Sequence, residues 1–467
     1  MPSHRSTAGG RTAGTAAPAP TGPPPARLVL LFAVACGSAV ATVYFAQPLL
    51  VTLGERFSLG SGLLGAIVTV TQLGYAAGLF LLVPLGDLVD RRRLITLQLG
   101  LLAVALLAVG LAPATAALLA ALVAVGALAV VAQTMVAAAA SLTAPAFRGR
   151  VVGSVTSGVI TGILLARTVA GVLADLAGWR AVYLFSAALT ATLTVLLRRS
   201  LPAGRPPTAP LPYRRLLAST VLLFARQPLL RVRGGLAFFV FAAFSTLWSS
   251  VVQPLSSPPW SLSHTAIGAF GLAGAAGALA AGIAGRWNDR GLAQRTTGIA
   301  LVLLALSWLP LAFTRQSLWA LAVGAVLLDF AVQAVHVINQ TLIHAVRPDA
   351  GSRIIGGYMI FYSAGSALGA TGSSLVYAAA GWSGVSVLGA AFSGAALLLW
   401  AVTRRLQQRA VVPPASPDDH RAVASSASPD GHRAAVPPAT PDDHRAAVQP
   451  ATPDDHRTVV PPATPDD

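Results

Sequence analysis

Four polar side chains recur along one apolar stretch of the sequence, residues 317–343. They are spaced i, i+4, i+7 and i+11, so an α-helix places them on one face: Asp329, Gln333, His336 and Gln340. A carboxylate removed from water and close to a histidine can exchange a proton at neutral pH. The pattern therefore predicts proton coupling through Asp329 and His336. A buried structural pair between Asp329 and Arg167 is the alternative.

An arginine stands alone in a second apolar stretch, residues 151–174. Arg167 lies about two-thirds along it, with no charged residue near it in the sequence. A charge inside a membrane is costly and by default marks a functional site. Arg167 is therefore predicted to bind an anionic substrate group or to pair with an acid. A side chain that extends to the membrane surface, about seven residues away, is the alternative.

The stretches that carry these residues are long enough to cross a membrane. The 467 residues are 55% hydrophobic and 10% charged, whereas soluble proteins are about 25% charged. A crossing helix needs about 20 apolar residues, and its backbone hydrogen bonds must close within the segment. The sequence predicts an all-α membrane protein with twelve transmembrane helices. They cover residues 28–53, 61–85, 94–112, 115–142, 151–174, 179–197, 232–253, 264–285, 296–313, 317–343, 354–377 and 382–403.

Arginine is distributed unequally between the loops of this predicted bundle. All 32 basic residues are arginine, and they gather in alternate loops. The positive-inside rule assigns such loops to the cytoplasm, which predicts a multi-pass protein with both termini cytoplasmic. Nucleic-acid binding is another explanation of a formal net charge of +16. It does not account for the alternation, so no nucleic-acid partner is expected.

Composition divides the chain into five parts. Residues 1–26, rich in Pro, Ala and Gly, are predicted to form a disordered cytoplasmic arm. Residues 27–197 and 232–405 are predicted to be two six-helix halves, joined by a basic, Pro-rich cytoplasmic linker at 198–231. Residues 406–467 are predicted to be a disordered tail of twelve-residue repeats. The four histidines of the tail could suggest metal capture, but a solvated low-complexity segment explains them as well.

Three motifs occur once in each half and in the same order. Their copies are separated by offsets of 206, 199 and 203 residues, which loop insertions explain. The halves are therefore predicted to be pseudo-symmetric repeats. The pairs are Gln47-Pro48-Leu49 with Gln253-Pro254-Leu255, Gly86…Asp90-Arg91 with Gly285…Asp289-Arg290, and Gly178-Trp179 with Gly381-Trp382.

The charged turn between the second and third apolar stretches resembles the signature loop of the major facilitator superfamily. A weaker copy lies at the corresponding turn of the second half. The resemblance covers about residues 28–405. It implies the major facilitator fold, with twelve transmembrane helices in two pseudo-symmetric six-helix halves. The matching residues of the first turn are Gly86, Leu88, Asp90, Arg91 and Arg93.

Residues 44–50, 74–87 and 148–180 are similar to a group of bacterial efflux permeases, the drug/arabinose-efflux-like group. This resemblance implies proton-coupled efflux of a small molecule by alternating access, as in an antiporter of the bacterial cytoplasmic (inner) membrane. Ile163 and Arg167 stand where proton/drug antiporters carry Pro and Gly. A uniporter or importer of a small solute therefore remains open, as does a non-transporting, transporter-like sensor.

The same resemblance implies that the two charged turns gate the transporter. Asp90 could pair with Arg148 or Arg150 and could face the start of the eleventh helix near Arg353–Gly356, and such contacts would latch the two halves in the outward-open state. Alternatively, these residues only anchor the turn and set the topology. The predicted gating residues are Gly86, Asp90, Arg91, Arg93, Asp289 and Arg290.

By the same resemblance, a central cavity is expected between the halves. Aromatic and amide side chains on the helices that line it favour an amphipathic or aromatic substrate, although each could instead serve packing. Gly268, Gly271, Gly274 and Gly277 are expected to let the eighth helix approach Gly158 and Gly162 of the fifth. The predicted substrate-binding residues are Tyr44, Gln47, Gln72, Tyr75, Gln133, Arg167, Trp248, Gln253, Gln333, Tyr358 and Tyr362.

The sequence contains no catalytic constellation. It has no phosphate-binding loop, no Gly-x-Ser-x-Gly motif and a single cysteine, Cys36. We therefore expect no enzymatic activity, no cofactor and no metal centre. The expected partners are the lipid bilayer, a small-molecule substrate and protons, and the energy must come from an ion gradient or from the substrate's own gradient.

Overall fold

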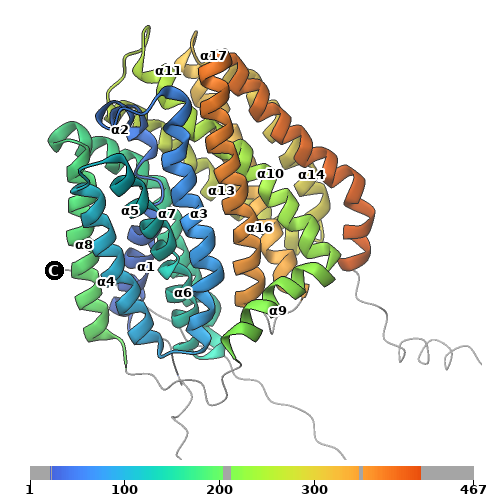
Figure 1. The fold of residues 1–467 in the computed structure, drawn as a ribbon. Coiled ribbons are helices and arrows are strands. Elements are labelled where there is room, and N and C mark those ends of the chain that lie inside the picture. Colours follow the sequence, from blue (N-terminus) through green and yellow to red (C-terminus); the bar gives the residue numbers. More distant parts are fainter. Residues whose placement is uncertain (1–21, 23, 203–211, 347–350, 412–467) are drawn as a thin grey trace, which may run out of the picture. The chain divides into compact units, whose positions relative to one another are not determined.

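The computed structural model describes residues 22, 24–202, 212–346 and 351–411 of the chain. These residues form helices and turns, and no strand occurs among them (Figure 1). The predicted all-α fold is confirmed. Most of the predicted N-terminal arm (1–26) and of the tail (406–467) lies outside the described residues.

The first half of the chain runs from α1 to α8. Its first passage is interrupted after α1, where Pro48 follows a turn and has no backbone N–H to continue a helix. The elements are α1 (Ala26–Ala41), η1 (Gln47–Leu49), α2 (Leu50–Arg56), η2 (Ser61–Leu63), α3 (Leu64–Leu81), η3 (Val83–Asp87), α4 (Arg91–Gly110), α5 (Thr115–Ala129), α6 (Val131–Ser141), α7 (Pro145–Ala177) and α8 (Trp179–Ser200).

The second half follows the linker helix α9 (Tyr213–Arg226). Its last helix, α17, contains one non-helical residue, Gly381, which divides it into two passages. The elements are α10 (Pro228–Ser250), α11 (Val252–Ser256), α12 (His264–Ala269), η4 (Phe270–Ala273), α13 (Gly274–Asp289), α14 (Ala293–Leu306), α15 (Trp308–Ala312), α16 (Leu318–Val346) and α17 (Gly351–Val411).

Nine helices in the described part of the chain are long and apolar enough to cross a membrane. One of them, Ile354–Arg404, covers the last two predicted crossings, because α17 continues through Gly381. The first and eighth predicted crossings correspond to the interrupted passages α1–η1–α2 and α12–η4–α13. The predicted twelve crossings are therefore reached when the interrupted and merged passages are counted with the others.

The backbone repeats between the halves at one of the three predicted motif pairs. Gly178 and Gly381 both have positive φ, +80° and +63°, a conformation that glycine adopts without steric cost. Each is followed by a buried tryptophan, Trp179 or Trp382. The two glycines therefore make the same sharp joint between the fifth and sixth passages of each half.

The linker between the halves contains a folded element that composition did not predict. Helix α9 buries Leu216, Thr220 and Phe224, which are spaced by four residues and share one face. Phe224 stacks on Phe361 of α17, and the Tyr213 hydroxyl donates to the carbonyl of Leu81 at 2.7 Å. Part of the predicted linker is thus an amphipathic helix that contacts both halves.

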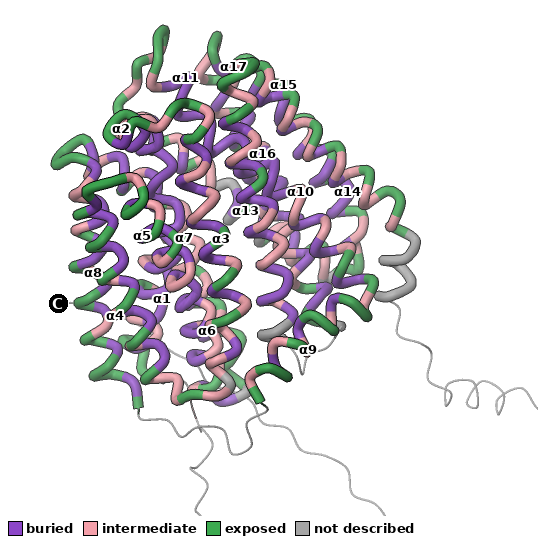
Figure 2. Tube along the Cα trace, in the orientation of Figure 1, coloured by how far each residue is buried: buried purple, intermediate pink, exposed green. Residues whose placement is uncertain are grey.

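The outer surface of the bundle is apolar. Figure 2 shows that buried residues follow the inward faces of the helices and exposed residues the outward faces. Large apolar side chains stand on those outward faces, among them Trp319 at 82% exposed and Leu176 at 77%. Such exposure is unfavourable in water and normal against lipid tails, so these side chains are consistent with a surrounding bilayer.

Candidate functional site

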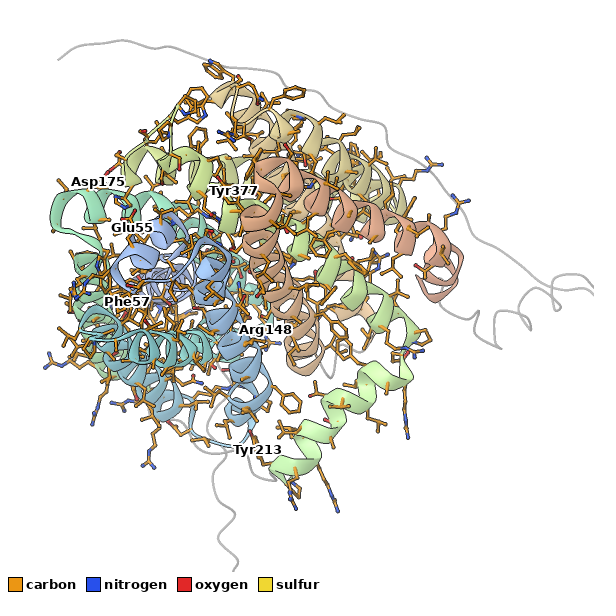
Figure 3. All side chains as sticks on the ribbon, turned by 45° about the horizontal axis from the view of Figure 1, so that its top comes forward. Glu55, Phe57, Arg148, Asp175, Tyr213 and Tyr377 are labelled. Atoms are coloured by element: carbon orange, nitrogen blue, oxygen red, sulfur yellow. The ribbon has the colours of Figure 1, made fainter. Side chains whose placement is uncertain are left out.

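The two halves meet closely at one end of the helical bundle, and we name the two ends after residues that lie there. We call them the Asp90 end and the His264 end. Figure 3 shows Asp175 and Glu55 at the His264 end and Tyr213 of α9 at the opposite end. At the His264 end, Thr69 of α3 donates to the Ala367 carbonyl and bonds the Thr371 hydroxyl, both on α17.

The contacts between α7 and α12 tighten this seal. The Thr168 hydroxyl donates to the Gly268 carbonyl at 3.0 Å. A side chain at Gly268 would collide with the backbone of Arg167, and one at Gly171 with that of His264. These glycines allow the two halves to meet backbone to backbone, so the His264 end is closed.

Arg167 lies on α7 beside these contacts and is 3% exposed. Its Nε donates to Gln47 Oε1 at 2.6 Å, which fixes one edge of the guanidinium group. Its guanidinium carbon lies 4.1 Å from the ring centroid of Trp248. The rings of Tyr44 and Phe244 complete an aromatic enclosure, with centroids at 5.3 and 5.5 Å. Such cation–π contacts compensate part of the cost of burying the charge.

One donor of this guanidinium group is unused. Arg167 Nη2 is buried and has no hydrogen-bond partner among the described residues. The alternative that Arg167 extends to the membrane surface is excluded in this conformation by its burial. A buried donor without a partner costs about 1–3 kcal/mol, so a ligand acceptor at this position would recover that energy.

Asp329 lies on α16 and is also 3% exposed. Its Oδ1 accepts a hydrogen bond from the indole Nε1 of Trp248 at 3.1 Å. Within the described ranges, the one ion pair closer than 4.0 Å joins His264 and Asp175, so Asp329 and Arg167 do not touch. Trp248 instead connects them, since its ring face meets the guanidinium group and its N–H meets the carboxylate.

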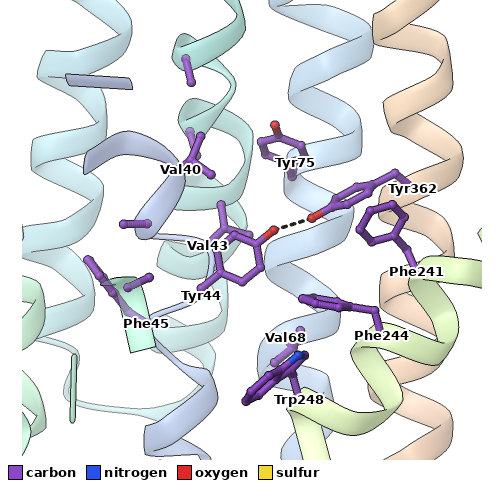
Figure 4. Close-up of a cluster of buried hydrophobic side chains, with 14 of the residues drawn as sticks. Val40, Val43, Tyr44, Phe45, Val68, Tyr75, Phe241, Phe244, Trp248 and Tyr362 are labelled. Carbon is purple, nitrogen blue, oxygen red and sulfur yellow. Dashed lines mark hydrogen bonds between the residues drawn. The ribbon is translucent and has the colours of Figure 1, made fainter. Parts of the chain in front are cut away.

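Two tyrosines cover this group on the side of the Asp90 end. The hydroxyls of Tyr44, which follows α1, and Tyr362 of α17 form a hydrogen bond between the halves (Figure 4). The Tyr362 ring packs against Phe241, two turns before Trp248 along α10. Tyr44, Arg167, Trp248, Asp329 and Tyr362 therefore form one buried cluster, which we call the central cluster.

The second predicted proton-coupling residue, His336, borders the central cluster, since its ring centroid lies 6.2 Å from that of Tyr362. Its Nδ1 lies 3.0 Å from the hydroxyl of Tyr358, which also accepts from Asn339 at 3.5 Å. Asn339 Oδ1 accepts from Nη1 of Arg233 at 3.0 Å. His336 thus belongs to a polar chain that leads toward the Asp90 end, while Asp329 belongs to the central cluster.

Arg233 in this chain is a functional candidate that the sequence did not single out. It is fully buried, and its Nε and Nη2 have no partner among the residues that the structure describes. Its place at the start of a predicted crossing suggested an ordinary linker arginine. Arg233 is the second residue of the predicted crossing at 232–253, and a charge inside a crossing was the available signal.

The other four glutamines predicted to bind substrate lie in different surroundings. Gln72 Oε1 and Gln253 Nε2 are buried without a partner in the described part of the chain. Gln133 interacts with the hydroxyl of Tyr75. Gln333 packs against α13, where a side chain at Gly277 would collide with it. Whether these four residues touch substrate stays a prediction.

The glycine prediction was correct for one helix and wrong for the other. Gly268 and Gly271 approach Arg167 on α7, as expected. Gly158 and Gly162, however, face Ala33 and Gly37 of α1. These two glycines therefore serve contacts inside the first half.

The predicted gate at the Asp90 end is built as a capped turn. Asp90 caps α4, because its Oδ1 accepts from the backbone N of Arg93 at 2.8 Å. Arg91 donates to the carbonyls of Gly86 and Ala137. In the corresponding turn, α13 ends at Asp289, and Arg290 is exposed.

The predicted partners of Asp90 do not reach it in this conformation. Arg148 donates to the Ala140 carbonyl at 3.1 Å, and Arg150 is exposed. Asp90 Oδ2 is buried without a partner among the described residues. The latch role of Asp90 therefore stays a prediction that concerns another conformation.

A connection between the halves that the sequence did not predict lies at the His264 end. The carboxylate of Asp175 on α7 accepts from the backbone N–H groups of His264 and Thr265, at 3.2 and 2.7 Å, and from His264 Nδ1 at 2.7 Å. His264 Nε2 bonds Thr52 Oγ1 at 2.7 Å. Asp175 thus caps the first turn of α12 across the interface, as anions do at helix N-termini.

Comparison with known proteins identifies relatives over most of the chain. The family model of the Major Facilitator Superfamily matches residues 29–282 and 237–438. The uncharacterized transporter YgaY of Escherichia coli O157:H7 is 45% identical over 373 residues, which cover 80% of this chain and 94% of YgaY. Multidrug resistance protein D of Escherichia coli K12 is 29% identical over 311 residues, or 65% of this chain and 76% of that protein.

A solved structure shares the fold. It is that of a bacterial homologue of the human lysosomal transporter Spinster, in an inward-facing and unoccupied conformation. The TM-score is 0.68 at 15% identity, and the match covers 83% of this chain and 98% of the other.

Proposed function

Because the chain belongs to the Major Facilitator Superfamily, a family of membrane transporters, we propose that it exports a small molecule in a proton-coupled cycle of alternating access. The observation that carries the proposal is Asp329. It is a buried carboxylate with one hydrogen bond, to Trp248, and no direct basic partner in the described chain. Such a group can change its protonation without breaking an ion pair.

The position of Asp329 supports coupling to the conformational change. Trp248 joins the carboxylate on α16 to Arg167 on α7, so it connects groups from the two halves. A proton on Asp329 removes a negative charge that helps to balance the buried guanidinium group. This alters the relative stability of conformations that hold the two groups at different distances, and a ligand shifts an equilibrium only through such a difference.

The closed His264 end supports alternating access. The seal formed by α3 with α17 and by α7 with α12 closes the His264 end, and we infer that the central cluster is reached from the Asp90 end. Toward that end α7 exposes Ser154, Ser157 and Thr161. We assign the Asp90 end to the cytoplasm from the distribution of arginines, so the conformation faces inward. The name of multidrug resistance protein D supports export as the direction.

The test replaces Asp329 by asparagine, which keeps an oxygen acceptor for the Trp248 indole and cannot exchange a proton. A substrate is first found by comparing the sensitivity of a deletion strain with that of a complemented strain. In proteoliposomes, Asp329→Asn is expected to abolish transport driven by a pH gradient while substrate counterflow continues. Glu55→Gln, at an exposed carboxylate of the His264 end, is the matched control and should keep both activities.

The result separates the proposed function from its alternatives. Full gradient-driven transport by Asp329→Asn would refute the role of Asp329. A uniporter would show counterflow that is equal in both proteins and unaffected by the pH gradient. A non-transporting sensor would show no flux of any compound in the wild-type protein.

A further inference from the structure

The central cluster offers a ligand three kinds of contact. The first is the unpaired Nη2 of Arg167, a charged donor that is buried with its side chain. The second is the aromatic wall of Trp248, Phe244 and Tyr44, whose rings surround the guanidinium group. The third is the Tyr44–Tyr362 hydrogen bond, a single polar contact on the side of the Asp90 end.

We propose that the substrate is an organic anion, a carboxylate carried on a flat apolar body. This assignment rests on the proposed transport function and names the class of substrate for the same site. The carboxylate accepts from Nη2 of Arg167, while Gln47 continues to hold Nε. The body lies against the rings of Phe244 and Tyr44. Hydrogen bonds between ionised groups are about twice as strong as neutral ones, which gives the carboxylate the dominant polar contact.

The same geometry disfavours other substrate classes. A cation would have to share the Trp248 face with the guanidinium group, which already occupies it at 4.1 Å. A neutral aromatic compound would leave Nη2 unpaired, and a buried unpaired donor is unfavourable.

Asp329 sets the sign of the coupling between anion and proton. Around Asp329, the central cluster contains three charged or titratable side chains: Arg167 from α7, Tyr44 from the segment after α1, and Tyr362 from α17. Helix α13 contributes Gly274 next to Asp329. An ionised Asp329 repels a carboxylate bound at Arg167, and a protonated Asp329 does not. The proton and the anion therefore bind together. Their joint export carries no net charge and is driven by the accumulation of the acid inside the cell.

The test measures binding to the purified full-length protein by isothermal titration calorimetry. The probes are naphthoate and its neutral isostere naphthamide, and the wild-type protein is expected to bind naphthoate about tenfold or more tightly. Arg167→Gln should reduce naphthoate affinity to that of the amide and leave amide binding unchanged. Arg56→Gln, at an exposed arginine of the His264 end, is the matched control and should bind like wild type.

Three results would overturn the assignment. They are absence of naphthoate binding to the wild-type protein, equal affinity for naphthamide, and unchanged naphthoate affinity in Arg167→Gln. The comparison of the two probes on the wild-type protein needs no variant, so it decides the question even if Arg167→Gln does not fold.

A pH series tests whether the two ligands load together. Naphthoate affinity should rise as the pH falls in the wild-type protein and lose this dependence in Asp329→Asn. Affinity that instead falls toward low pH would show competition, as in an antiporter, and would refute joint loading. If naphthoate binding requires Arg167 while transport ignores the proton gradient, the proposed function fails and the substrate class stands.

Discussion

Replacing Asp175 by alanine is expected to open the His264 end. The carboxylate of Asp175 on α7 holds the first turn of α12 by accepting three hydrogen bonds, from two backbone N–H groups and from His264 Nδ1. These contacts join the two halves and exist only while this end is closed. Asp175→Ala removes all of them and leaves the helix backbone of each half intact, so it should destabilise one conformation selectively.

The geometry gives a magnitude for this effect. The side chains of His264 and Asp175 are 29% and 28% exposed, so water replaces part of each lost interaction. Each hydrogen bond then contributes about 0.7 kcal/mol, and the three together contribute about 2 kcal/mol. This corresponds to about a 30-fold shift of the equilibrium toward conformations open at the His264 end.

Spin-label distances can measure that shift. The single cysteine, Cys36, is buried and can be replaced by alanine to give a background free of reactive thiols. Cysteines at the exposed positions 56 and 257 then report the separation of the halves at the His264 end by double electron–electron resonance. Exposed positions 199 and 290 report the Asp90 end. Asp175→Ala should add a longer distance to the first pair and a shorter one to the second.

The control is Glu55→Ala, which removes an exposed carboxylate from the same end and should leave both distances as in wild type. Unchanged distance distributions in Asp175→Ala would refute the argument that this carboxylate holds the end closed. A longer distance at both ends would indicate general loosening of the bundle, and this too would contradict a selective lock.

Two further changes probe the central cluster and the seal beside it. Tyr44→Phe removes the hydrogen bond to Tyr362, which contributes about 0.5–1.5 kcal/mol. We therefore expect the leak of substrate from proteoliposomes without a proton gradient to rise about 3- to 10-fold. Tyr362→Phe should have the same effect, and additive effects in the double variant would show that the bond is not responsible. Gly268→Val places a side chain against the Arg167 backbone and should abolish substrate counterflow. The control Gly100→Val should keep counterflow, because no neighbouring atom approaches that position within 4 Å. Equal counterflow in the two valine variants would contradict the role of close contact between α7 and α12.

The architecture could be predicted because hydrophobic length and motif repetition act locally. Uncharged runs of about 20 residues define crossings whatever surrounds them, and the copies Gly178 and Gly381 make the same joint in each half. The interruptions within crossings were missed. The break at η1 comes with Pro48, which has no backbone N–H, and hydropathy does not register a proline inside an apolar run.

The site was predicted in part, for a related reason. A lone buried charge is visible in the sequence, so Arg167 and Asp329 were identified, and both lie in the central cluster. Their connection through Trp248 was not visible, because residues 167, 248 and 329 belong to three different helices. Asp175 was not identified, because a carboxylate at the end of a crossing resembles an ordinary loop residue in the sequence. Its partner His264 is also 89 residues away along the chain.

Helix α7 links the places where this transporter must act together. It carries Asp175 at the His264 end, Arg167 in the central cluster, and Arg148 near the turn of Asp90. In the described conformation the Asp175 lock is made, while Asp90 Oδ2 has no partner among the described residues. Arg148 lies in the same half as Asp90, so it reaches that oxygen only if α7 moves relative to the Asp90 turn when the first lock breaks. We therefore expect that the contacts of Asp175 with α12 and a contact of Arg148 with Asp90 do not form at the same time. The charge of the groups beside Arg167 should determine which of the two contacts forms.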